Sequence, residues 1–249
     1  MTTASAGPTR SIRRADYGLD APGVVRTLGA LGAALVVAGI VLFMRGSGGS
    51  AHTLGRIALW MGGSWVAAAL LMVASSRAGK LRARDRLLDR LALRGDETVL
   101  DVGCGHGLLL IGAARRLPSG HAIGIDLWSQ KDQAANSAEA TLANADAEGV
   151  RERVEVRNGD MRELPFADAS IDAVVSSLAI HNVPSSADRA RALAEIVRVL
   201  KPGGRIGVLD IAHIDEYARV LRDLGCTVDR VALVPTIFPP TRELTARRG

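Results

Sequence analysis

The run VLDVGCGHGLLL at residues 99–110 is the stretch from which the fold of this 249-residue chain can be inferred. A short apolar strand ends in Asp101, three glycines follow at alternate positions, and an apolar helical pattern begins at Leu108. Glycines at this spacing allow a sharp turn from a buried strand into a helix, and they let a ligand approach the backbone. We therefore expect an open α/β sheet with a ligand crevice over the carboxyl end of this strand.

From residue 95 to residue 249, strand-like runs alternate with helical patterns, as in a parallel sheet that has helices on both faces. The expected strands are 98–101, 121–127, 153–157, 171–177, 205–211, 227–234 and 242–246. The last two flank a Pro239-Pro240 turn and should pair as an antiparallel hairpin. The sequence thus predicts a doubly wound, seven-stranded, Rossmann-like domain over residues 95–249.

Two uncharged runs precede this domain, at residues 27–44 and 57–76. At ~1.5 Å per residue each gives a helix of roughly 27–30 Å, about the thickness of the hydrocarbon core of a bilayer. We expect residues 24–76 to form a hairpin of two membrane spans. A cleaved signal peptide would have a shorter apolar region and no second span. Buried helices of a soluble domain would show a polar face, which neither run has.

The cations beside the spans predict the orientation of the hairpin. Residues 1–23 carry several arginines and are expected to be a disordered cytoplasmic arm, and residues 77–94 carry seven cations against two anions. Only Arg45 and Arg56 lie in the loop between the spans. Both termini and the C-terminal domain should therefore face the cytoplasm, with the protein in the cell (inner) membrane.

Residues 77–94 are expected to form a basic amphipathic helix that connects the second span to the domain. Leu81, Leu87, Leu88 and Leu91 make one apolar stripe among arginines. This helix could cover an edge of the domain, lie on anionic headgroups, or do both. The positive charge is concentrated here and aromatic residues make up only 3% of the chain. A base-stacking surface is therefore not expected, and neither is a nucleic-acid partner.

Five blocks, in order, resemble the motifs of the class I S-adenosylmethionine-dependent methyltransferases: VLDVGCGHG, GIDL, NGDMRELPF, IDAVVSSLAIHNV and VLKPGGRIGVLDI. They are most similar to the methyltransferase type 11 branch that includes the ubiquinone/menaquinone C-methyltransferases. The resemblance covers roughly residues 80–249 and does not extend to the two spans. The hairpin followed by KLRARDRLLDRL looks like a membrane-attached bacterial subgroup. The resemblance implies S-adenosyl-L-methionine as the cofactor and no metal.

Carried over position by position, the resemblance assigns the methionine end of the cofactor to Asp101 and to the backbone of Gly103, Gly105 and Gly107. It assigns the ribose to Asp126, which ends the second strand about 20 residues beyond the glycines. A nicotinamide enzyme would share that acidic residue. Asp126 therefore indicates a nucleoside without choosing the cofactor.

Further along the chain, the resemblance places Leu127 against the adenine. Asp160 would accept a hydrogen bond from the adenine amino group, and Met161 would donate through its amide. Ser177 and Leu178, at the end of the fourth strand, would border the reacting sulfonium. Met161 and Leu178 are equally typical of a hydrophobic core.

Methyl transfer from a sulfonium requires alignment and exclusion of water, and it needs a base only if the acceptor must lose a proton. His181, just past the fourth strand, is the candidate catalytic base, since an unperturbed histidine has a pKa of about 6.5. Packing or hydrogen bonding to a substrate is the alternative role. Asp210 is a weaker candidate for the base, and His106 is expected to be structural.

The function expected from these features is methyl transfer, at the membrane, to a small lipophilic acceptor such as a quinone, a polyprenyl phenol or a lipid. A catalytically silent membrane scaffold that binds a nucleoside is one alternative. An NAD(P)-dependent reductase is another, although Leu108 occupies the third glycine position of the nicotinamide fingerprint. The polar segment 129–137 is either a solvated loop or a flap over the nucleoside, with Trp128 as its apolar contact.

Overall fold

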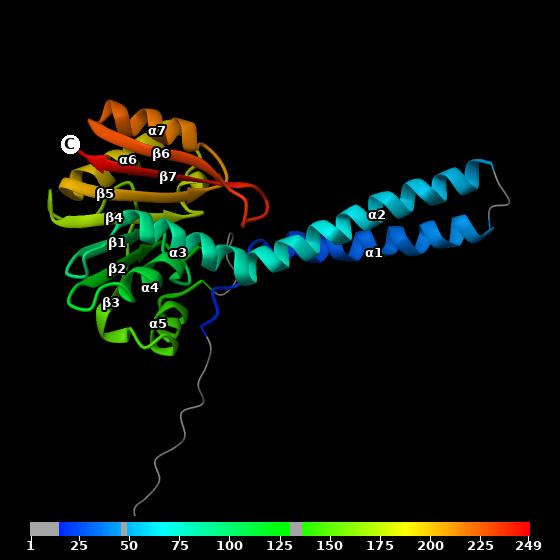
Figure 1. Ribbon diagram of the computed structural model, residues 1–249, viewed down its shortest axis with the longest axis horizontal. Helices are drawn as coiled ribbons and strands as arrows, with labels where there is room; N and C mark the ends of the chain where they lie inside the picture. The colour runs from blue at the N-terminus through cyan, green and yellow to red at the C-terminus, as the bar shows by residue number, and fades with distance from the viewer. Residues whose placement is uncertain (1–14, 46–48, 130–135) are drawn as a thin grey trace, which may run out of the picture.

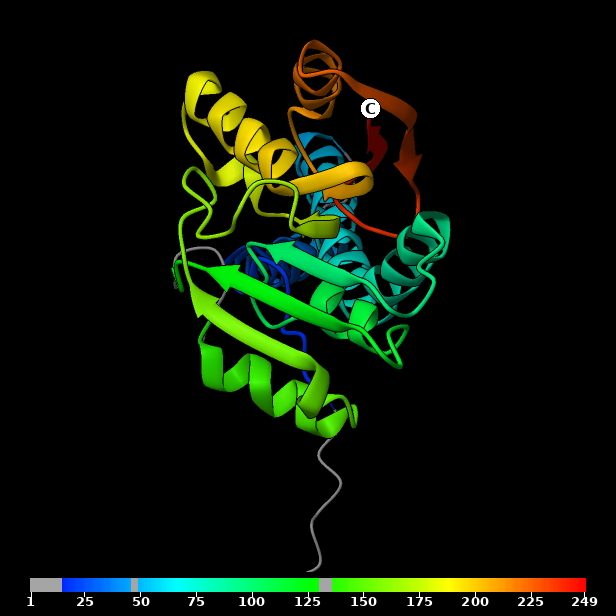
Figure 2. The same cartoon turned by 90° about the vertical axis from the view of Figure 1, so that its left-hand side faces the viewer.

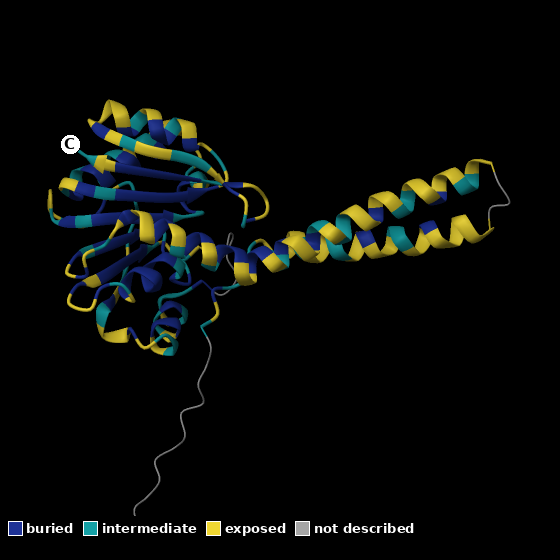
Figure 3. Ribbon diagram, in the orientation of Figure 1, coloured by how far each residue is buried: buried dark blue, intermediate teal, exposed yellow. Residues whose placement is uncertain are grey.

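A computed structural model describes residues 15–45, 49–129 and 136–249, which form a helical hairpin and an α/β domain (Figure 1). The hairpin consists of α1 (Pro22–Arg45) and α2 (Ser50–Ala74). Both helices are long and apolar enough to cross a membrane, with mean hydropathies of 2.3 and 1.9 in their most apolar windows. Only 11% and 17% of those windows are buried, and the hairpin is exposed along most of its length (Figure 3). The two helices are therefore not core helices of the domain.

The second helix of the hairpin runs without a break into the domain. It passes through one π-helical turn, η1 (Ser75–Gly79), into α3 (Lys80–Leu91), so that 42 residues form one continuous helix. Three leucines of α3 pack in the domain core at 2% exposure or less, namely Leu87, Leu88 and Leu91. The basic helix expected from the sequence thus covers the domain, while its arginines at positions 82 and 86 face solvent.

Seven strands form one sheet, in the order β3-β2-β1-β4-β5-β7-β6. Their bounds are β1 (Thr98–Val102), β2 (His121–Asp126), β3 (Val154–Asn158), β4 (Ile171–Ser177), β5 (Leu200–Asp210), β6 (Cys226–Val234) and β7 (Thr241–Arg248). Five strands are parallel, and β7 is antiparallel to both β5 and β6. The predicted doubly wound sheet and its final hairpin are confirmed. The main differences are that β5 begins at Leu200 and β7 extends to Arg248.

Helices cover both faces of the sheet (Figure 2). They are α4 (Leu108–Ala114), α5 (Ala138–Ala147), α6 (Ser186–Val199) and α7 (Ile214–Asp223), with 3-10 turns η2 (Arg151–Arg153) and η3 (Ile180–Asn182). One core cluster joins α3, α4 and α5 to the sheet, and a second joins α6 and α7 to it. Because both faces are covered, the central strands are almost wholly apolar.

Residues 15–20, which we call the pre-span segment, pack against the domain, although the sequence placed them in a disordered arm. The side chain of Tyr17 is 7% exposed and lies in the domain core. The Lys80 ammonium donates to two backbone carbonyls of the segment, at 2.6 and 2.8 Å, and pairs with Asp20 at 3.2 Å. These partners are distant in sequence, so no local pattern revealed them. Residues 1–14 of the predicted arm lie outside the described residues.

The hairpin leaves the domain at the edge of the sheet where the parallel strands end (Figure 1). The backbone N–H of Phe238, in the β6–β7 loop, donates to Ser75 Oγ at the base of the hairpin, at 2.8 Å. At the other end of α3, Arg205 of β5 donates to the carbonyl of Leu91, also at 2.8 Å. Helix α3 is therefore antiparallel to β5. The carboxyl ends of the parallel strands and the base of the hairpin lie together.

Candidate functional site

The glycine loop between β1 and α4 has a backbone that ordinary residues rarely adopt. Gly103, Gly105 and Gly107 have φ angles of +73°, +49° and +83°. A Cβ atom on Gly103 would collide with the methyl group of Ala179, which follows β4. The N–H groups of residues 103 and 104 donate to the carbonyl of Ile125, at 2.9 and 3.0 Å. The loop is thus held against β2, and its first glycine packs directly against Ala179.

Asp101 lies beneath this loop and is 1% exposed. Its Oδ2 accepts a hydrogen bond from the N–H of Leu110 at 2.8 Å, and its Oδ1 is buried without a partner among the described residues. Burial raises the pKa of Asp101 to about 8, and the nearby Asp126 carboxylate adds to the rise. An acidic side chain with a spare, buried oxygen is therefore aimed at the start of α4.

Asp126, at the end of β2, faces the glycine loop. Its Oδ2 accepts from the N–H of Gly105 at 2.9 Å, and its Oδ1 accepts from the N–H of Trp128 at 2.7 Å and from Asn136 Nδ2 at 3.2 Å. The next residue, Leu127, is 60% exposed. Asp126 therefore fixes the loop while keeping part of its acceptor capacity.

The segment 129–137, for which the sequence left a solvated loop and a flap as alternatives, follows Asp126 closely in the chain. Trp128 has a φ of +57°, is half-buried and packs in part against the domain core. Residues 130–135, the middle of this segment, lie outside the described residues.

Asp160 is engaged by a residue that the sequence analysis missed. The side chain and N–H of Arg162 donate to both carboxylate oxygens of Asp160, at 2.7 to 3.1 Å. This pairing lowers the pKa of Asp160. Met161 is half-buried, packs against the core and lies beside Gly103. The Arg162 donors occupy the acceptor positions that the sequence reserved for an adenine amino group.

At the end of β4, Ser177 and Leu178 are half-buried. The backbone turns at Leu178, which has a φ of +53° and donates its N–H to the carbonyl of Leu209 in β5, at 2.8 Å. This turn carries the chain into η3, which contains His181.

The structure brings together His181 and Asp210, which the sequence treated as separate candidates. They follow or end the neighbouring strands β4 and β5. His181 Nδ1 lies 2.5 Å from Asp210 Oδ1, close enough for an ion pair but not aligned as a hydrogen bond. The backbone N–H of His181 donates to Asp210 Oδ2 at 3.1 Å. Because Nδ1 lies against the carboxylate, Nε2 is the ring nitrogen left to contact a ligand.

Asp210 is fully buried, whereas the His181 side chain is 20% exposed. The hydroxyl of Tyr217, from α7, also donates to Asp210 Oδ2, at 3.3 Å. Burial raises the pKa of Tyr217, and the Asp210 carboxylate raises it further. The tyrosine hydroxyl therefore stays protonated and donates to Asp210. The carboxylate of Asp210 in turn contacts His181 at Nδ1, the ring nitrogen opposite Nε2.

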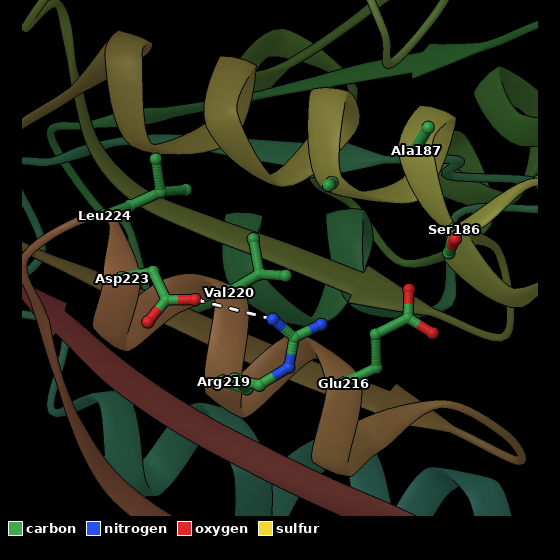
Figure 4. Close-up of a pocket in the computed structure, with 8 residues that line it drawn as sticks. Ser186, Ala187, Glu216, Arg219, Val220, Asp223 and Leu224 are labelled. Atoms are coloured by element: carbon green, nitrogen blue, oxygen red, sulfur yellow. Dashed lines mark ion pairs between the residues drawn. The ribbon is translucent and has the colours of Figure 1, made fainter.

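The two cavities described for the domain lie away from these residues. One, of about 420 Å³, lies between α6 and α7 and contains the ion pair of Arg219 with Asp223 at 3.5 Å (Figure 4). The other, of about 390 Å³, is lined by Arg94, Asp172 and the start of β5. Neither contains a residue that the sequence predicts for the site.

Residues 100–208 match the sequence profile of the family described as "Methyltransferase domain". A demethylmenaquinone methyltransferase of Lactobacillus johnsonii is 33% identical over 52% of this chain and 50% of its own length. The ubiquinone/menaquinone biosynthesis C-methyltransferase UbiE of Dinoroseobacter shibae is 36% identical over 53% and 49%. The chain thus spans about half the length of the curated relatives it matches.

Solved structures share the fold of the domain. A SAM-dependent methyltransferase from Aquifex aeolicus superposes with a TM-score of 0.57 at 21% identity, over 68% of this chain and 92% of that one. Geranyl diphosphate C-methyltransferase from Streptomyces coelicolor gives a TM-score of 0.56 at 18% identity, over 68% and 77%. At these identities the likeness concerns the fold alone.

Proposed function

Because residues 100–208 match the family described as "Methyltransferase domain", we propose that this protein is an S-adenosylmethionine-dependent methyltransferase anchored in the cell membrane. Its acceptor is a small lipophilic molecule such as a quinone, a polyprenyl phenol or a lipid. The observation that carries the proposal is the glycine loop, which is bound by Asp126 and follows directly on Asp101, whose Oδ1 is buried without a partner among the described residues.

The residues present fit the proposed cofactor. The buried Oδ1 of Asp101 suits a donor on the methionine end. Asp126 has acceptor capacity left for the ribose hydroxyls, and the exposed side chain of Leu127 suits one face of the adenine. Since Arg162 saturates Asp160, we assign adenine recognition to Leu127 and to the amide of Met161, not to Asp160.

S-adenosylmethionine, when bound, supplies a methyl group on an activated sulfonium. The chain then has to align the acceptor in line with that bond and exclude water. Ser177 and Leu178 border the place where the transfer occurs. His181 accepts the proton at Nε2 when the acceptor must lose one, and the Asp210 carboxylate stabilises the imidazolium that forms.

Three features support a lipophilic acceptor and a membrane location. The names of two relatives refer to quinone biosynthesis. The two apolar helices are long enough to span a bilayer. The cations flanking them favour an orientation with both termini and the domain in the cytoplasm. In this proposal the enzyme and its methyl acceptor are located in the same bilayer.

The test is a transfer assay on the full-length protein in lipid nanodiscs, with methyl-labelled S-adenosylmethionine and a panel of quinones, polyprenyl phenols and phospholipids. Label should enter one lipid-soluble class, and His181→Ala should reduce its rate. Comparing methylated lipids by mass spectrometry, with and without the gene, identifies the product. A catalytically silent scaffold would transfer no label, and its His181→Ala and Asp126→Ala variants would fully complement a deletion strain.

A further inference from the structure

The contacts at the hairpin base fix the height of the domain relative to the second span. Ser75 is the last residue but one of the uncharged run 57–76, and it accepts the hydrogen bond from the N–H of Phe238. The following residue, Ser76, accepts through Oγ from the N–H of Asp20 at 3.1 Å. The β6–β7 loop and the pre-span segment therefore lie level with the end of the uncharged run. Since about 20 helical residues cross the hydrocarbon core, this level is its boundary.

The large apolar side chains exposed on the domain are gathered at this level. Outside α1 and α2, five large hydrophobic side chains are exposed among the described residues, namely Leu127 (60%), Ile211 (45%), Leu224 (38%), Leu233 (61%) and Phe238 (37%). Four of them follow or end a strand at the carboxyl edge of the sheet. The exception, Leu224, follows α7 and precedes β6 at the opposite edge. A random scatter of exposed apolar groups would not favour one edge in this way.

The glycine loop is tied to the same level. The side chain of Asn144 makes two hydrogen bonds, each of 2.8 Å, with the backbone of Asp16, and it donates to the carbonyl of His106 in the glycine loop at 3.0 Å. The four Cα–Cα steps from Asp16 to Asp20, which binds Ser76, span at most ~14 Å. The cofactor loop is therefore close to the base of the hairpin, and not at the far end of the domain.

We propose that the carboxyl edge of the sheet rests on the bilayer surface, with Ile211, Leu233 and Phe238 inserted among the lipid headgroups. The inference depends on the proposed function in one respect, which is that α1 and α2 span the membrane. The partner is a phospholipid surface, and an anionic one fits best. The exposed cations Arg26 and Arg77 lie at the start of α1 and just beyond α2, where phosphate groups would be.

This arrangement determines how the acceptor reaches the site. His181 and the glycine loop lie on the same edge as the inserted side chains, so the reacting group of a membrane-resident acceptor enters from the bilayer side. The isoprenoid or acyl part of such an acceptor stays in the hydrocarbon. The domain thus has no need to extract the whole molecule into water.

The test places single cysteines that carry a fluorophore in the full-length protein, reconstituted in phosphatidylcholine/phosphatidylglycerol vesicles with lipids bearing a quencher near the headgroup. The test positions are Ile211→Cys, Leu233→Cys and Phe238→Cys. Leu224→Cys is the matched control, since its exposure of 38% equals that of Phe238 (37%) within one percentage point. Leu70→Cys, 64% exposed on α2, reports whether the hairpin is in the bilayer. The native cysteines are both buried, and unsubstituted protein provides the labelling blank.

We expect quenching at positions 211, 233 and 238 to exceed that at position 224 by threefold or more, with position 70 also quenched by lipids that carry a deeper quencher. Quenching at position 70 alone, with the three edge positions as unquenched as 224, would overturn this inference and leave the anchor standing. A hairpin position that lipids do not quench would overturn the anchor and the inference with it.

Discussion

Gly103→Ala is the substitution whose effect the structure specifies most closely. Gly103 has a φ of +73°, and an added Cβ would collide with the Cβ of Ala179. Gly149 is a matched control, because its φ is +69° and nothing lies within 4 Å of its added Cβ. Both substitutions place an alanine in left-handed backbone, but only the first also creates an overlap. Comparing the two therefore separates backbone strain from steric collision.

The magnitudes follow from these two costs. Left-handed backbone costs a non-glycine residue about 1–2 kcal/mol. Overpacking a well-filled region costs about 1–3 kcal/mol more, and the Gly103 Cβ would lie far inside the ~3.5–4.0 Å of normal carbon contact. We expect the free energy of unfolding to fall by about 1 kcal/mol in Gly149→Ala and by about 3 kcal/mol in Gly103→Ala. Ala179→Gly removes the colliding methyl group, so the double variant should recover about 2 kcal/mol.

The assay is urea unfolding of the full-length protein in detergent, followed by circular dichroism, for the variants of this cycle. Titration with S-adenosylhomocysteine should show the same order, with affinity lowered at least tenfold in Gly103→Ala and largely restored by Ala179→Gly. Equal losses in the two glycine variants, or no coupling between positions 103 and 179, would refute the assigned geometry of the loop.

Three other predictions concern the cofactor loop, the pre-span segment and the hairpin. Because burial raises the folded-state pKa of Asp101 from 3.8 to about 8, the folded state binds the extra proton, and the free energy of unfolding should fall as pH rises through that window. Asp101→Asn lacks this dependence, so a difference between wild type and variant that stays constant from pH 5 to pH 8, in urea unfolding, would contradict it. Asn144→Ala removes three hydrogen bonds and should cost about 2 kcal/mol and speed amide exchange in residues 15–20; unchanged exchange there would show that the segment is held otherwise. In Gly62→Ala the new Cβ would lie 2.6 Å from the carbonyl oxygen of Gly32, whereas Gly63 faces open space. The unfolding temperature should therefore fall in Gly62→Ala and not in Gly63→Ala. Equal effects of the two substitutions would rule out close packing of α1 on α2.

The sheet and its order along the chain were predictable because their causes are local. The strand–glycine–helix run at 99–110 and the apolar run at 171–177 each identify a buried strand. The continuous helix from α2 to α3 was missed, since the cations after residue 76 indicate the end of a membrane span as readily as the end of a helix. The pre-span segment was missed for a different reason. Tyr17 and Asp20 find their partners far along the chain, in η1, in α3 and just after α5.

The positions of the candidate site residues at the strand ends were predictable from the sequence, but the contacts of their side chains were not. The pairing of His181 with Asp210 depends on β4 and β5 being neighbours, which the strand order provides only after folding. A basic residue two places after Asp160 was a visible signal, because side chains in one short loop can pair without any tertiary contact. That signal would have identified Arg162 as a donor that competes with the expected adenine amino group for the carboxylate of Asp160.

Calorimetric titration of the full-length protein with S-adenosylhomocysteine tests the central claim most directly. The account predicts one molecule bound per chain, an affinity at least tenfold lower in Asp126→Ala, and no displacement by a nicotinamide dinucleotide. Folded protein, verified by circular dichroism, that shows no binding heat at millimolar S-adenosylhomocysteine would contradict it.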